Sequence, residues 1–153
     1  MSKLFKRLFQ KHFCPPAQAK LLELFDATPY LQRAILLVET TPLSGIRTTY
    51  LLEEHSHTSH LKVRQTNLKE KTERTVIETE LPQSDFAKVL DCVEEGGVEL
   101  GNFTGKVKDG IYYSLCWGSP AALRHVTIDN PQFGSPRHQD FINAVKSSML
   151  PKR

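Results

Sequence analysis

The residues best suited to binding a metal ion are three histidines in one polar stretch, His55, His57 and His60. Neutral imidazole rings are common Zn²⁺ ligands, and rings two residues apart on a hairpin can share one ion. The spacing does not match a recurring ligand pattern, however, and no fixed fourth ligand stands beside it. We therefore expect a solvated loop with no metal and no other cofactor, and a metal bound by these three histidines is the alternative.

A nucleophile and a base could meet on two strands predicted on either side of a turn at 118–121. If that turn is tight, Ser114 lies opposite His125 with Cys116 diagonal to it, and a Ser–His or Cys–His pair could begin covalent catalysis. No Gly-x-Ser-x-Gly turn surrounds the serine. Active sites also favour concave clefts over the flat face of a sheet. We expect no catalytic residue here, and whether these side chains line a pocket stays open.

Basic residues on two further predicted strands are candidates for holding phosphate. They would line an anion channel if the sheet curled into a barrel. In an open hairpin, alternation places Lys62 and Arg64 on one face together with Glu78 and Glu80. Pairing Lys62 with Glu80 and Arg64 with Glu78 then gives a ladder of opposite charges, which is the interpretation we favour. The basic residues considered are Lys62, Arg64, Lys69, Lys71 and Arg74.

Residues 2–13 form a basic amphipathic segment. The apolar positions follow helical spacing, with the basic positions between them. A helix of this length is marginal in water, so its apolar side must meet its own domain, a protein partner, a second copy of the chain or a membrane surface. We favour protein over lipid because Pro15 and Pro16 would hold the segment close to the body. The candidate contact residues are Lys3, Leu4, Phe5, Lys6, Arg7, Leu8, Phe9, Lys11 and Phe13.

Charge and cysteine content limit the classes of partner and compartment. Five of the 20 Lys and Arg residues lie in residues 1–22, which contain no acid, so the remainder has 17 acids against 15 bases. A body with this balance is not expected to bind nucleic acid. Three cysteines without a CxxC pair indicate a reducing compartment. We expect a cytoplasmic protein, or a membrane-peripheral one if residues 2–13 bind lipid.

The elements that must position these residues follow from periodicity and turn signals. An unbroken apolar run at 35–38 predicts a strand buried on both faces. Ser84 is the expected N-cap of a helix that stops at Gly96–Gly97, and Ser135–Pro136 begins the last helix. Helices are expected at 2–13, 17–27, 84–95 and after 135, with strands at 33–41, three across 46–81, then 98–107, 111–117 and 121–129.

This order, α-α-ββββ-α-βββ-α, predicts an α+β fold. We expect an antiparallel sheet of about six to seven strands in two meander blocks, with helices packed mainly on one face. Residues 1–14 would be the basic amphipathic helix and residues 15–153 a single domain, which is an ordinary size.

The sequence shows features of binding surfaces more clearly than it shows residues spaced for catalysis. The leading hypothesis is a non-catalytic protein-binding domain of the chaperone, inhibitor or immunity, or adaptor type, which binds a protein partner or itself. The alternative is a small hydrolase, metal-dependent through the histidines or acting on phosphates through the basic strand residues.

Overall fold

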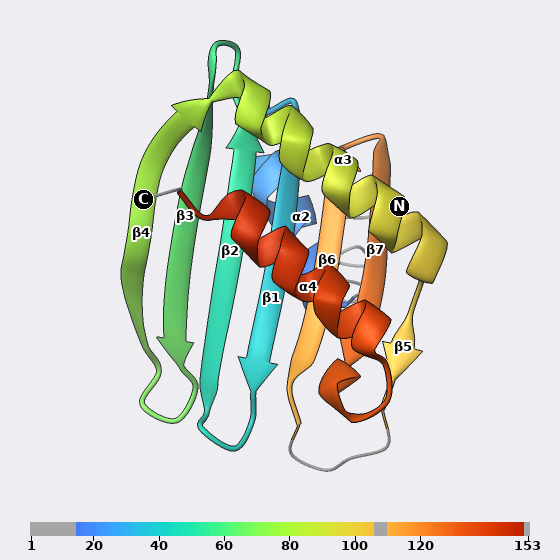
Figure 1. Cartoon of the computed structure of the whole chain (residues 1–153). Helices are drawn as coiled ribbons and strands as arrows, with labels where there is room; N and C mark the ends of the chain where they lie inside the picture. Colours follow the sequence, from blue (N-terminus) through green and yellow to red (C-terminus); the bar gives the residue numbers. More distant parts are fainter. Residues whose placement is uncertain (1–14, 106–109, 152–153) are drawn as a thin grey trace, which may run out of the picture.

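The computed structural model describes residues 15–105 and 110–151. Its centre is a seven-stranded sheet with the strand order β4-β3-β2-β1-β6-β7-β5 (Figure 1). Neighbouring strands are antiparallel, except that β5 runs parallel to β7. The sheet is open, with β4 and β5 at its two edges, so no barrel channel encloses the basic strand residues. The strands are β1 (Arg33–Thr41), β2 (Ile46–Glu54), β3 (Thr58–Asn67), β4 (Thr72–Pro82), β5 (Phe103–Thr104), β6 (Tyr112–Ser119) and β7 (Ala122–Asp129).

Helices pack on both faces of this sheet. Helices α3 (Gln83–Leu100) and α4 (Pro136–Met149) cross one face, and α2 (Pro16–Ala27) lies behind the sheet against β1 and β6 (Figure 1). A short 3₁₀ helix, η1 (Pro131–Phe133), precedes α4. The α+β class and the mainly antiparallel sheet agree with the sequence prediction. The helix expected at 2–13 falls outside the described residues.

Strand β1 is buried from both sides, as its apolar run predicted. Ile35 and Leu37 belong to the main core under α3 and α4. Leu36 and Val38 belong to a second, smaller core under α2. Because side chains alternate along a strand, one continuous apolar run serves both cores.

Helix α3 differs from the prediction at both ends. It begins at Gln83 after Pro82, so Ser84 is not its N-cap. It also continues through Gly96 and Gly97, where the sequence suggested a stop. A Cβ on Gly96 would lie 2.3 Å from Cδ1 of Phe141, and one on Gly97 would lie 2.7 Å from Cη2 of Trp117. These glycines allow α3 to approach α4 and β6 closely, and this packing outweighs their low helix propensity.

Because α3 is longer than predicted, the strand that follows it is shorter than predicted. The helix takes up residues 98–100 and ends before Gly101, whose φ is +65°. Of the strand expected at 98–107, only the two residues of β5 form among those described.

The predicted register of the β3–β4 hairpin was also wrong. Lys62 pairs with Glu78 instead of Glu80, and Arg64 pairs with Thr75 instead of Glu78. The chain turns over residues 68–71, where Lys71 adopts a left-handed φ of +56°. A register shift beside Val63 and Arg64 then changes the pairing by one residue along the rest of the hairpin.

Helix α4 begins as predicted, since the Ser135 hydroxyl accepts a hydrogen bond from the His138 backbone N–H. Its inner side includes Phe141, Val145 and Met149, whereas Ala144 and Ser148 are exposed. His138 and Ile142 are buried on α4 as well.

Candidate functional site

Helix α2 leaves the back of β2, β3 and β4 uncovered, and charged side chains gather on this part of the sheet. We call it the charged face. It carries Arg47 and Glu53 from β2, His60, Lys62 and Arg64 from β3, and Glu73 and Glu78 from β4. A groove of about 380 Å³ lies between this face and α2. Its lining comprises Lys20, Leu21, Glu23, Leu24, Ala27, Leu36, Thr49, Leu51, Glu53, Lys62, Arg64, Thr66 and Glu73.

The periodicity of a helix and that of a strand place the residues that line this groove on facing sides. On α2, positions 20, 23, 24 and 27 recur at helical spacing and so face the same side. On β3, Lys62, Arg64 and Thr66 recur every second residue and share a face. Leu36 and Leu51 add apolar surface from the neighbouring strands. The groove therefore combines apolar surface with charged walls.

Lys20 and Arg64 both line the groove, and Arg47 lies on the same face of the sheet, where its charge acts on Lys20. We call these three residues the cationic cluster. Partial burial lowers the pKa of the Lys20 ammonium, and the positive charges of Arg47 and Arg64 lower it further, while Glu73 and Glu23 act in the opposite direction. Arg64 donates from Nη1 to Oε1 of Glu73 over 3.2 Å. Its Nε is buried and has no hydrogen-bond partner among the described residues. An anion near this cluster would be favoured.

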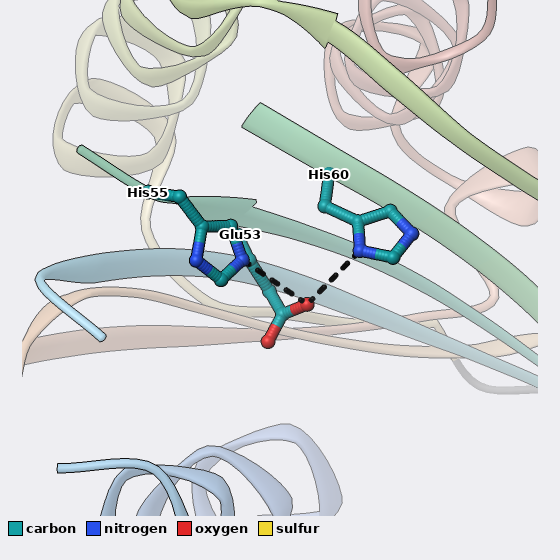
Figure 2. Close-up of side chains that lie close together, drawn as sticks. All are labelled: Glu53, His55 and His60. Carbon is teal, nitrogen blue, oxygen red and sulfur yellow. Dashed lines mark ion pairs between the residues drawn. The ribbon is translucent and has the colours of Figure 1, made fainter. Parts of the chain in front are cut away.

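A second group of titratable side chains lies near the start of β3, and we call Glu53, His55 and His60 the carboxylate–histidine cluster. Glu53 and His60 face each other across β2 and β3. Oε1 of Glu53 lies 3.8 Å from Nε2 of His55 and 3.9 Å from Nδ1 of His60. Figure 2 shows this carboxylate between the two rings, on the α2 side of the sheet.

The loop between β2 and β3 brings His55 into this cluster. The His55 backbone N–H donates to the carbonyl oxygen of Thr58 over 2.9 Å, which closes a short turn after Glu54. His57 lies in this turn and is exposed. The structure therefore brings together two of the three predicted histidines, with Glu53 beside them in place of His57.

Sequence reasoning missed Glu53 because it gave no residue-by-residue register between the strands that became β2 and β3. The signal was present in the alternation, since Glu53 and His55 are two residues apart. Antiparallel pairing then brings His60 opposite Glu53. The pairing register was the missing information.

The candidate residues Ser114, Cys116 and His125 are paired differently from the expectation, since Cys116 and not Ser114 lies opposite His125. The Ser114 hydroxyl accepts a hydrogen bond from the Ala17 backbone N–H over 3.1 Å, and so anchors the start of α2. Cys116 is fully buried in the core under α2 and pairs directly with His125, which is exposed. None of the three lines the groove.

The candidate contact residues within 2–13 lie outside the described residues, so their role stays a prediction. None of the helices in the described ranges combines the length and apolar character needed to cross a membrane. No protein family model matches this chain, and a search of curated proteins found no match either. Its function is therefore inferred from the residues themselves.

Proposed function

We propose that this chain is a non-catalytic protein-binding domain that takes an acidic segment of a partner protein into the groove between α2 and the charged face. The observation that carries the proposal is the cationic cluster. Lys20 and Arg64 both line the groove. Partial burial, together with the positive charges of Arg47 and Arg64, lowers the pKa of Lys20. Glu73 is the carboxylate that bonds Arg64. A carboxylate from a ligand would relieve the mutual repulsion of these cations.

The shape of the charged wall favours an extended segment. Lys62 and Arg64 stand two residues apart on β3, which corresponds to about 7 Å along a strand. Side chains of an extended peptide repeat at the same interval, so alternate acidic residues could meet both cations. The apolar surface of Leu36 and Leu51 would contact the aliphatic parts of such a segment.

The structural roles of the candidate nucleophiles Ser114 and Cys116 also favour a binding function over a catalytic one. Ser114 holds the N-terminus of α2, and Cys116 lies beneath that helix without exposure. Neither side chain has access to the groove. The groups that do line it are charged and apolar side chains suited to recognition.

The test uses a short peptide that alternates Glu and Ala and a matched peptide that alternates Lys and Ala. Isothermal titration calorimetry of the full chain at low salt should detect the acidic peptide and not the basic one. Arg64→Gln should weaken the acidic peptide about tenfold, which corresponds to about 1.4 kcal/mol. Added salt should weaken binding further, because the contacts are partly solvated.

The matched control is Arg137→Gln. Arg137 lies on α4, across the sheet from the groove, and pairs with Glu99 at the surface. This variant should bind the acidic peptide as the unaltered chain does. Equal loss in both variants, or no binding of the acidic peptide at all, would contradict the proposed groove.

A further inference from the structure

We infer that Glu53, His55 and His60 form a binding site for a divalent transition metal of the zinc class. One carboxylate oxygen and two imidazole nitrogens would be the ligands. These three potential ligand atoms all lie within 4.8 Å of one another, although they come from β2, a loop and β3. This inference goes beyond the proposed recognition of an acidic segment and does not depend on it.

The distances suit a tetrahedral ion after small side-chain rotations. Zinc bonds of about 2.0–2.2 Å at tetrahedral angles put neighbouring ligand atoms about 3.4 Å apart. The observed distances of 3.8 Å and 3.9 Å from Oε1 of Glu53 to the two histidine nitrogens are only slightly longer. The three atoms all lie within 4.8 Å of one another, and rotation of the two rings toward the carboxylate would bring them closer to this spacing.

The burial of Glu53 is a second observation that points to a cation. Glu53 is only 8% exposed. Among the described residues, its ion-pair contacts are the two histidines, both beyond hydrogen-bond distance. A buried carboxylate without a close donor is unfavourable. A metal ion between Glu53 and the two rings would supply the missing positive charge.

Glu78 is placed to orient one of the proposed ligands. Its Oε1 lies 3.6 Å from Nε2 of His60, on the side of the ring opposite the nitrogen that faces Glu53. If Nδ1 of His60 binds the metal, Nε2 carries the proton and can donate it toward Glu78. Metal-binding histidines commonly direct their second nitrogen to a carboxylate in this way. Nζ of Lys62 lies 3.7 Å from the same oxygen and helps to hold Glu78 in place.

The mixed nitrogen and oxygen ligand set determines the class of ion. Imidazole favours zinc and its neighbours among the transition metals, whereas magnesium and calcium prefer oxygen ligands. Three protein ligands leave one position of a tetrahedral ion for water or a ligand group. Because Glu53 also lines the groove, a group bound there would lie near that position.

The test begins with dialysis of the full chain against a chelator. Zn²⁺ is then titrated into the metal-free chain, and binding is measured by calorimetry. One ion per chain should bind, and Co²⁺ in its place should give the intense visible absorption of a four-coordinate site without a thiolate charge-transfer band. His60→Ala and Glu53→Gln should abolish this binding. Glu78→Gln should weaken it about 10-fold to 100-fold, as expected for a residue that orients a ligand.

The matched control is His57→Ala, which removes the exposed histidine of the same loop and should leave zinc affinity unchanged. Circular dichroism would verify that each variant is folded. Absence of saturable binding would overturn the inference. So would equal losses in His57→Ala and His60→Ala, which indicate loose chelation by the loop, or binding that survives His60→Ala, which indicates ligands elsewhere.

Discussion

Glu53 and Glu54 are neighbours on β2, both are buried, and they face opposite sides of the sheet. Glu54 accepts two hydrogen bonds from Arg33, at 2.8 Å from Nε and 2.6 Å from Nη2. The Arg33 guanidinium in turn lies 5.2 Å from the centre of the Phe86 ring. Glu53, on the α2 side, has two histidine nitrogens at 3.8 Å and 3.9 Å. The first carboxylate is satisfied by the fold, whereas the second is left available for a ligand.

The same difference separates the two faces of the sheet as a whole. The side under α3 and α4 is a continuous apolar core. On the other side, α2 covers a smaller core over β1 and β6, and the charged face lies beside it. Stability should therefore depend mainly on the first side and binding on the second.

The largest expected effect on stability comes from replacing Leu36 or Leu37, which are adjacent on β1 and face opposite sides of the sheet. Leu37→Ala should lower the free energy of unfolding by about 3–5 kcal/mol, because it leaves a cavity in the main core. Leu36→Ala should cost about 2–3 kcal/mol, since Leu36 borders the groove and water can enter part of the space. Urea denaturation of both variants measures the difference. A greater loss for Leu36→Ala would show that the smaller core dominates stability.

The next comparison exchanges each glutamate for its uncharged isostere. Glu54→Gln should destabilise the chain by about 1–3 kcal/mol, because it removes charged hydrogen bonds from a pair whose arginine is partly solvated. Glu53→Gln should leave stability unchanged or raise it in metal-free buffer, since its charge lacks a close donor. Denaturation in the presence of a chelator measures both. A loss for Glu53→Gln as large as that for Glu54→Gln would show that the two carboxylates are equally structural.

Local patterns predicted most of the elements because each depends on residues close in sequence. The apolar run at 35–38 showed that β1 is covered on both sides, and Ser135 marked the start of α4. The extent of α3 could not be predicted in this way. It depends on Phe141 and Trp117, which lie far along the chain and pack directly against Gly96 and Gly97.

The candidate site was predicted less completely, because it depends on strand pairing. Both of its histidines were among the three considered for a metal site, although no metal was expected there. Glu53 was missed because it joins them only when β2 and β3 are paired. The hairpin partner of Lys62 was wrong because the left-handed conformation of Lys71 and the register shift determine the alignment. Neither feature has a strong signature in residue type.

The smallest expected effect concerns the ion pair between Lys62 and Glu78 on the charged face. Their charged atoms lie 3.7 Å apart, and the side chains are 24% and 49% exposed. Solvent screens such a pair, so a double-mutant cycle with Lys62→Gln and Glu78→Gln should give a coupling of about 0–1 kcal/mol. Urea denaturation of the four proteins at low and high salt measures it, and the coupling should decrease with salt. The same Glu78→Gln variant is expected to weaken zinc binding markedly, because Glu78 orients His60. A coupling well above this range would mean that the charged face stabilises the fold as the apolar face does, and the distinction between the two faces would fail.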